Sequence, residues 1–201
     1  MPLSPPSPRQ HLHTREIDIK GYYRDDGLWD IEGHITDKKT YTYEKLTPGI
    51  VAAGYPVHDM SLRLSIDSTF VVREVEALID EQPYTACSDV LGNYQRLVGL
   101  KIGPGWNKRA REAVGGVEGC THITELLGPM ATVTFQTLAG DYAEQLMAET
   151  LGEDQQPDEG EAPHMLNGCY SWRPGGEVVK ELYPAFYEEP DIEPVKIIES
   201  S

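Results

Sequence analysis

The stretch YRDDGLWDIEGHITD, residues 23–37, decides the fold that we expect for the first part of the chain. Asp26-Gly27 separates two runs of alternating apolar and polar residues, 15–23 and 28–37, and this dipeptide favours the tight turn of a β-hairpin. In the second run the odd-numbered and even-numbered residues differ in polarity. The odd-numbered residues Trp29, Ile31, Gly33 and Ile35 are apolar, and the even-numbered residues Asp30, Glu32, His34 and Thr36 are polar. The pattern predicts two antiparallel strands with one apolar and one polar face.

A second hairpin is predicted in VHDMSLRLSIDSTFVVREVEALID, residues 57–80, with a turn at Asp67-Ser68 and a return strand from about Phe70 to Ala77. Beyond it the apolar spacing becomes helical in three segments, 88–100, 106–114 and 115–150, the last bent or split at Gly128-Pro129. Strands followed by helices indicate the α+β class, with an N-terminal antiparallel sheet of two hairpins and then a helical half.

Composition divides the chain into four parts. Residues 1–13 are rich in proline and predict a disordered arm, and residues 14–150 form the α+β domain. An acidic linker is expected over 151–163. Residues 164–201 regain aromatic residues and a Gly-Gly pair, which predicts an extension with a short hairpin that packs partly on the domain.

The length of 201 residues fits one domain with a tail, and the formal net charge of −16 excludes several partners. Such a surface repels phosphate backbones and anionic lipid, so we expect neither nucleic acid nor a membrane as partner. A small-molecule substrate or a protein partner remains. No apolar run reaches the roughly 18 residues of a membrane span, and the odd number of cysteines is typical of a reducing compartment, so we expect a cytoplasmic protein.

The candidate active site lies in GGVEGCTHITELL, residues 115–127, where glycines lead into a predicted helix. A thiol in the first helical turn feels the helix dipole, which favours the reactive thiolate, so Cys120 is a candidate nucleophile with His122 as its base or as a ligand. The alternative interpretation is that Thr121 is only a helix cap and that Cys120 is a small buried apolar residue.

Cys87 follows the second hairpin and precedes a predicted helix, so a compact domain could bring it near Cys120. Cys87, Cys120 and His122 would then supply three of the four ligands of a zinc or iron site. No C-x-x-C pair supports this set, and a structural role for Cys87 is the alternative.

Two further histidines are candidate proton carriers. His34 shares its strand face with Asp30 and Glu32, which predicts either an acid–base face or an ordinary solvated sheet surface. His58 has the parity of the apolar residues that follow it, so it belongs either to the active site or to the core. His11 and His13 lie in the arm and its junction, and no role is expected for them.

The chain resembles a bacterial family known only as a domain of unknown function, through the blocks YYRDDGLWDIEGHITDKK, HDMSLRLSID, GLKIGPGW, GCTHITELLGPMATVTFQT and NGCYSWRPGGEVVKELYP. In the order of its elements it is also similar to iron–sulfur scaffold proteins of the NifU and IscU type. That resemblance implies that Cys87 and Cys120 stand at the first and last scaffold cysteines. The middle cysteine is absent near Gly103, and the histidine follows Cys120 instead of preceding it.

No G-x-S-x-G, H-E-x-x-H, kinase or dinucleotide-binding motif marks a known enzyme class. The main hypothesis is a small enzyme that acts on a small organic metabolite through a Cys/His-centred site, with either Cys120 or a metal-bound water as the nucleophile. Trp29, Tyr22 and Trp106 suggest an organic acid or an aromatic compound. The alternatives are a non-enzymatic carrier of metal or an iron–sulfur cluster, and an accessory protein that binds partners through its acidic tail.

Overall fold

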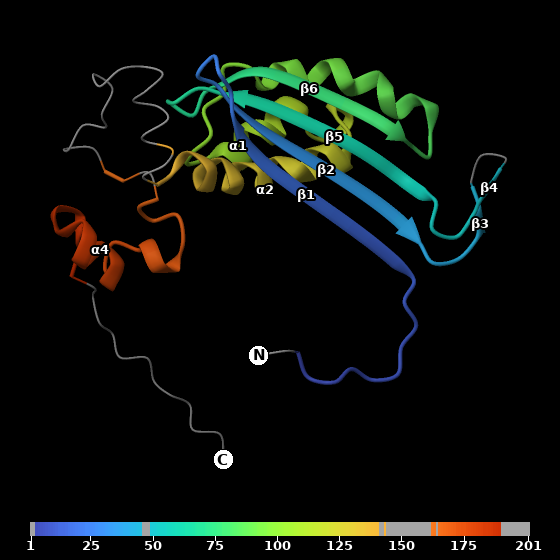
Figure 1. Ribbon diagram of the computed structural model, residues 1–201, viewed down its shortest axis with the longest axis horizontal. Coiled ribbons are helices and arrows are strands. Elements are labelled where there is room, and N and C mark those ends of the chain that lie inside the picture. Colours follow the sequence, from blue (N-terminus) through green and yellow to red (C-terminus); the bar gives the residue numbers. More distant parts are fainter. Residues whose placement is uncertain (1–2, 46–48, 141–142, 144–161, 164, 190–201) are drawn as a thin grey trace. The chain divides into compact units, whose positions relative to one another are not determined.

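The computed structural model of the protein describes residues 3–45, 49–140, 143, 162–163 and 165–189. The chain divides into two units, Met1–Gln155 and Gln156–Ser201. The first unit contains an antiparallel sheet of four strands followed by helices (Figure 1). The predicted α+β class is therefore confirmed.

Both predicted hairpins are present in the sheet, whose strand order is β1-β2-β5-β6. The strands are β1 (His13–Tyr23), β2 (Trp29–Lys39), β5 (Pro56–Ile66) and β6 (Val72–Glu81). Gly27 adopts a φ of 84° in the first turn, a backbone conformation that costs glycine little. Two short strands between the hairpins, β3 (Tyr43–Glu44) and β4 (Ile50–Val51), form a separate pair that the sequence did not predict. Two residues are too few to show a period.

The helical half contains η1 (Thr85–Leu97), α1 (Trp106–Val114), η2 (Gly116–Glu118) and α2 (Thr121–Leu138). The segment predicted as a first helix is a 3₁₀ helix. Pro129 lies inside α2, yet the helix is not split there. Proline removes one backbone hydrogen bond, and the burial of one α2 face against the sheet compensates for that loss. Of the predicted helical residues after 140, only Ala143 is described.

One hydrophobic core lies between the sheet and the helices. The inward residues of β2 and β5 are almost fully buried, namely Ile31, Ile35, Met60, Leu62, Leu64 and Ile66. A Cβ atom on Gly21 would lie 2.0 Å from Thr137 Oγ1, and one on Gly33 would lie 2.9 Å from Met130 Sδ. These glycines of β1 and β2 let α2 cross closely over the sheet.

The contacts of α2 also fix its direction over the sheet. Thr137, in its C-terminal part, lies over Gly21, and Glu125, near its N-terminus, contacts Arg15, six residues earlier in β1. The helix advances about 18 Å from residue 125 to residue 137, and six residues of strand span about 20 Å. The helix therefore runs along the strands and brings its N-terminus to the end of the sheet where β1 begins.

The second unit corrects one expectation. Its described residues form η4 (Tyr170–Trp172), α4 (Glu177–Leu182) and η5 (Pro184–Phe186), so the predicted hairpin in this extension is wrong. The Gly-Gly pair precedes α4 and does not join two strands. EVVKEL contains good helix formers, and one buried residue, Val179, anchors the turn. Most of the predicted linker, 151–163, lies outside the described residues.

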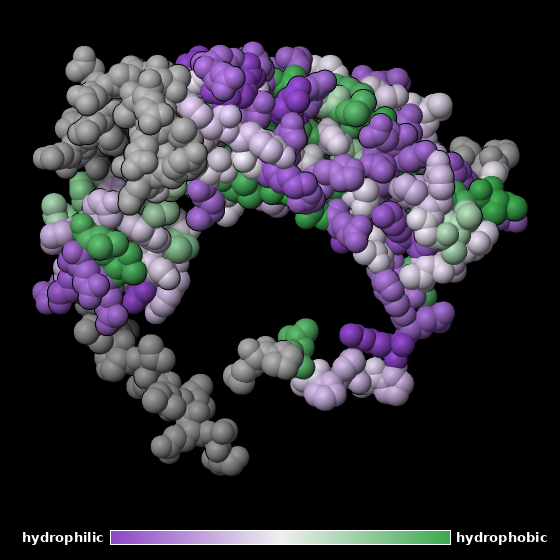
Figure 2. Space-filling view, viewed as in Figure 1, coloured by the Kyte–Doolittle hydropathy of each residue, from purple (hydrophilic) through white to green (hydrophobic). Residues whose placement is uncertain are grey.

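The sheet face turned away from the helices is hydrophilic, as the view of the strands in Figure 2 shows. Residues 3–12 contain no helix or strand, and the regular structure begins at His13. In the described part of the chain, no helix combines the length and the apolar character that a membrane crossing needs.

Candidate metal site at the start of helix α2

Three strands place one polar row on the helix-facing side of the sheet. Arg15 of β1 pairs with Asp37 of β2, and Asp37 pairs in turn with His58 of β5. Asp37 has the same parity as Ile31 and Ile35, so its side chain points toward the helices. The register of β2 and β5 shifts immediately after Asp37, an irregularity of the kind that re-aims side chains near functional sites.

The Asp37 carboxylate is the centre of the cluster, and only 3% of its side chain is exposed. Arg15 holds it with two hydrogen bonds, from Nε to Oδ1 and from Nη2 to Oδ2, both 2.8 Å long. His13 Nε2 lies 3.0 Å from Oδ1, and His58 Nδ1 lies 3.1 Å from Oδ2. The other end of the Arg15 guanidinium pairs with Glu125 of α2. The buried charge is therefore compensated by Arg15, and side chains of two strands, β1 and β5, contact the carboxylate.

Helix α2 adds His122 to this row. His122 Nε2 lies 3.6 Å from Asp37 Oδ2, and the imidazole rings of His58 and His122 stack with centroids 3.6 Å apart. Tyr94 of η1 fixes the start of the helix, because its buried hydroxyl donates to the Cys120 carbonyl at 3.0 Å and accepts from the Cys120 N–H at 3.1 Å. The position of His122 thus depends on a contact between η1 and α2.

Electrostatics favour a negative carboxylate and neutral imidazoles. Burial alone would raise the pKa of Asp37, but the Arg15 hydrogen bonds and the positive charges around it hold that pKa below its usual value. Burial lowers the pKa of both His58 and His122, and for each the attraction of Asp37 is too weak to reverse the shift. At neutral pH the two rings are therefore uncharged, and each has one N–H and one nitrogen lone pair beside a charged carboxylate.

Asp37, His58 and His122 are suited to hold a metal ion. One potential ligand atom of each lies within 4.8 Å of those of the other two. Within the described ranges, no other trio of histidine, cysteine or acidic side chains meets that condition. Two imidazoles and one carboxylate are a donor set that zinc and non-haem iron use.

Cys120 lies beside this trio but outside it. Its Sγ is 3.8 Å from Nδ1 of His122, on the ring edge away from Asp37, and 3.7 Å from Met60 Sδ. Cys120 is the residue immediately before α2 and makes no side-chain cap hydrogen bond. His122 therefore bridges a thiol on one side and a carboxylate on the other.

The other predicted site residues lie elsewhere. Cys87 is in η1, and with Cys120 and His122 it forms no ligand trio in the described part of the chain, so the expected Cys87–Cys120–His122 set is replaced by the trio above. His34 faces the opposite side of the sheet, where its Nε2 lies 2.6 Å from Asp59 Oδ1 and its side chain is 47% exposed. The third cysteine of the chain, Cys169, for which no site role was assigned from the sequence, is an exposed thiol of the second unit.

The aromatic residues expected near the pocket also lie outside the trio. Trp106 is buried and donates to the Leu127 carbonyl, and Trp29 packs against Tyr23 near the far end of α2. Tyr22 is exposed.

Sequence reasoning missed three residues of the cluster, Asp37, Arg15 and His13. Parity alone could have found Asp37, because it continues the apolar face two residues after Ile35. An acid on an otherwise apolar face needs a cationic or metal partner. Finding Arg15 and His13 would have required the register of β1 against β2 as well.

The fold and the cluster define a class of protein, a small α+β domain that encloses one carboxylate and its histidine neighbours between a sheet and the first turn of a helix. The chain belongs to the family described as "Protein of unknown function (DUF2889)", which matches residues 13–136. This range begins with β1 and contains every residue of the cluster. The predicted membership of a domain-of-unknown-function family is confirmed.

No curated protein matches the chain, and no solved structure matches it. The similarity to scaffold proteins of the NifU and IscU type stays a prediction.

Proposed function

We propose that this protein is a metal-dependent enzyme that acts on small organic molecules, with Asp37, His58 and His122 as the ligands of one zinc or iron ion. The three unpaired cysteines are consistent with work in the reducing cytoplasm. The observation that carries the proposal is the spacing of the donor atoms around Asp37 Oδ2.

The two separations between donor atoms are close to the ligand–ligand distances of a tetrahedral metal site. Ligand atoms about 2.0–2.2 Å from a tetrahedral zinc ion lie roughly 3.3–3.6 Å from one another. Oδ2 of Asp37 is 3.1 Å from His58 Nδ1 and 3.6 Å from His122 Nε2. A cation between these atoms would take the place of the proton that His58 Nδ1 shares with the carboxylate, so little rearrangement is needed.

The surrounding side chains would orient the ligands. Metal-bound imidazoles usually donate their other N–H to a neighbour, and bound carboxylates are themselves hydrogen-bonded. Cys120 lies beside Nδ1 of His122, and Arg15 holds both oxygens of Asp37. Under this proposal Cys120 and Arg15 support the ligands and do not bind the metal.

Three protein ligands leave a coordination position for water. A bound divalent cation lowers the pKa of that water and polarises a carbonyl oxygen placed beside it. The chemistry that fits is hydrolysis or hydration of a small carbonyl compound. The same open position also suits a metal carrier, which would bind the ion but convert no substrate.

The test is metal content and affinity in protein purified without oxygen and without a histidine tag. We expect about one zinc or iron per chain, with the affinity reduced at least tenfold in Asp37→Asn, His58→Ala and His122→Ala. His34→Ala is the matched control, because it removes an exposed histidine on the other sheet face. Absence of metal from the unaltered chain, or equal loss in His34→Ala, would contradict the proposal.

A second candidate function, thiol catalysis, is favoured by the alignment of Cys120, His122 and Asp37. His122 has Cys120 Sγ at 3.8 Å on one ring nitrogen and Asp37 Oδ2 at 3.6 Å from the other. That order is the one in which a carboxylate orients a histidine that activates a thiol. Rapid labelling of Cys120 by iodoacetamide that slows in His122→Ala, in protein without metal, would favour this function over the first.

A further inference from the structure

We infer that the groove between α1 and α2 binds a small organic acid, with Arg111 holding its carboxylate. That this acid is the substrate rests on the proposed function, whereas the binding itself does not. The groove has a volume of about 170 Å³ and mixes apolar walls, including Ala110, Leu127 and Pro129, with polar groups. This volume suits a ligand smaller than a typical drug molecule.

The first observation is an uncompensated positive charge. Arg111 lines the groove, and it forms no ion pair with any residue that the structure describes. Glu125, the acid of the groove, is paired with Arg15. The amide of Asn107, which also lines the groove, has no hydrogen-bond partner in the described part of the chain. A guanidinium and an amide left without partners in one groove are suited to a carboxylate.

The second observation is Gly128, which lines the same groove in the middle of α2. Glycine is a poor helix former, and at most crowded positions close packing explains it. Here it does not, because a Cβ atom on Gly128 would have only Asn107 Oδ1 near it, at an ordinary contact distance of 3.5 Å. The missing side chain keeps space for a ligand and serves no packing need.

The third observation is the local charge. In a chain of net charge −16, the segment 96–111 contains no acid and carries Arg96, Lys101, Lys108, Arg109 and Arg111. This segment leads into α1 and forms one wall of the groove. A basic region on an otherwise acidic protein attracts small anions toward it.

The groove is connected to the cluster through one guanidinium. Glu125 lines the groove and pairs with Arg15, which at its other end holds Asp37. A ligand seated against Glu125 therefore lies one side chain away from the proposed metal ligands. We assign the groove to the acid group of the substrate, with the reacting part extending toward Asp37.

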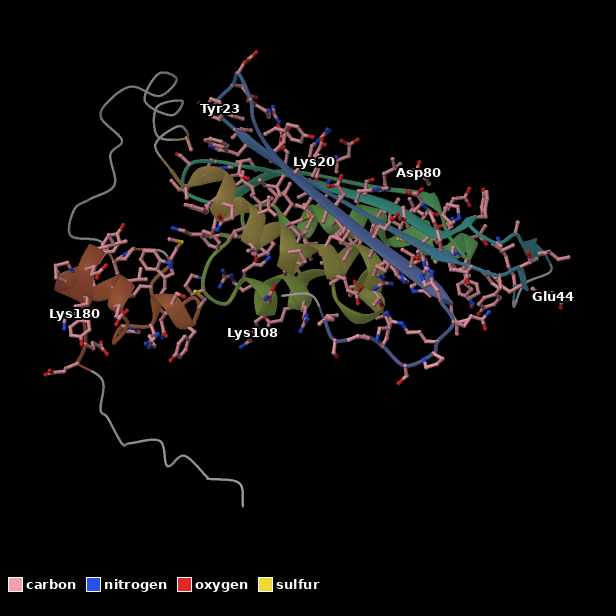
Figure 3. The ribbon with its side chains drawn as sticks, turned by 60° about the horizontal axis from the view of Figure 1, so that its bottom comes forward. Lys20, Tyr23, Glu44, Asp80, Lys108 and Lys180 are labelled. Atoms are coloured by element: carbon pink, nitrogen blue, oxygen red, sulfur yellow. The ribbon has the colours of Figure 1, made fainter. Side chains whose placement is uncertain are left out.

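The test uses benzoate as the probe, followed by NMR chemical shifts of the α1 and α2 amides in the full chain. We expect benzoate to shift the amides that line the groove, and benzyl alcohol, its neutral counterpart, to shift them much less. Arg111→Gln should weaken benzoate binding at least about tenfold. Lys108→Gln is the matched control, because it removes the same charge from an exposed residue of α1 that projects away from the protein (Figure 3).

Gly128 gives an independent test. Gly128→Ala should raise the melting temperature by about 2–3 °C and at the same time weaken benzoate binding. If Gly128 had only a structural role, the substitution would not produce this combination of higher stability and weaker binding. Benzoate shifts absent from the groove, or equal losses in Arg111→Gln and Lys108→Gln, would overturn the inference. If the protein binds metal but not benzoate, this inference is wrong and the proposed function stands. If the protein binds benzoate but no metal, the proposed function is wrong and this inference stands. His122→Ala should lose metal and keep benzoate.

Discussion

At the scale of the residue, Asp37 is the side chain on which the candidate site depends. Its carboxylate is buried and contacts Arg15, His13, His58 and His122. Removing one partner from a buried ion pair leaves an uncompensated charge, which costs more than the pair itself contributes. The side chains that form the candidate site therefore also contribute to the stability of the fold, and this contribution can be measured.

Arg15→Met keeps most of the apolar stem of the side chain and removes the guanidinium. We expect the free energy of unfolding to fall by about 2–3 kcal/mol, because Asp37 loses two charged hydrogen bonds. Adding Asp37→Asn to that variant should cost less than it does alone, with a coupling energy of at least about 1 kcal/mol. Urea unfolding at neutral pH measures all three variants. Strictly additive losses would show that Arg15 and Asp37 act independently.

Arg63→Met is a suitable control for that cycle. Arg63 pairs with Glu32 and Glu76 on the outer sheet face, where the three side chains are 43–67% exposed. Exposed ion pairs contribute little to stability. We expect a loss below about 1 kcal/mol.

At the scale of the element, the start of α2 depends on η1. The buried hydroxyl of Tyr94 bonds both the carbonyl and the N–H of Cys120 and lies 3.0 Å from Thr124 Oγ1. The Cys120 carbonyl also accepts from the Thr124 N–H at 2.9 Å, whereas the Cys120 N–H, one of the unpaired donors of a helix start, has the Tyr94 hydroxyl as its acceptor. The helix N-terminus is thus fixed by tertiary contact and not by a side-chain cap.

Tyr94→Phe should leave the fold intact and loosen this N-terminus. We expect a loss of about 1–3 kcal/mol in the free energy of unfolding, because the Cys120 N–H loses its acceptor inside the protein. Metal affinity should fall as well, since His122 follows Cys120 by two residues. Calorimetry and a metal titration check the two parts. An unchanged metal affinity together with the stability loss would show that His122 is positioned by other contacts.

The turn between β5 and β6 provides a pH test at the same scale. Burial alone would raise the pKa of Asp67, but hydrogen bonds from Thr69, the Val71 N–H and Arg73 outweigh it, so the pKa is lowered. A lowered pKa stabilises the fold above the unfolded value of about 3.9 and loses that contribution as the pH falls through the folded value.

Asp67→Asn should therefore destabilise the protein most near neutral pH, because asparagine cannot offer a charged acceptor to Arg73. The difference in free energy of unfolding between the variant and the unaltered chain should shrink below about pH 4. Urea unfolding at several pH values measures this difference. A difference that stays constant down to pH 2 would contradict the role assigned to the carboxylate.

At the scale of the whole molecule, the apolar core belongs to one unit. Among the residues that the structure describes, every buried hydrophobic one except Val179 lies within Met1–Gln155. The family range, 13–136, ends two residues before the end of α2. This distribution indicates that the first unit supports its own fold and its own site.

A chain ending at Gln155 should keep a cooperative thermal transition within about 2 °C of the full chain, because the sheet core is complete. Its metal content should match that of the full chain. Differential scanning calorimetry and metal analysis test both statements. Loss of metal with an intact transition would place part of the site in residues 156–201 and would favour a role for the acidic tail.

The sequence by itself determined the α+β class, the two hairpins and the face of each strand residue. This was possible because successive side chains of a strand point to opposite faces, so the order of apolar and polar residues is enough to assign each residue to a face. The same alternation extends to Asp37, two residues after Ile35, but that acid was not selected from the sequence. The segment after residue 163 was read as a hairpin because a Gly-Gly pair suits a turn and a helix start equally well.

Only the tertiary structure decided that one carboxylate unites the site. Arg15, Asp37 and His58 form a row because of strand register, and His122 reaches it because α2 crosses the sheet over Gly21 and Gly33. Register and helix placement depend on packing between segments far apart in the sequence, so no local pattern contains them. That is why His58, Cys120 and His122 could each be selected from the sequence, while their grouping around Asp37 could not.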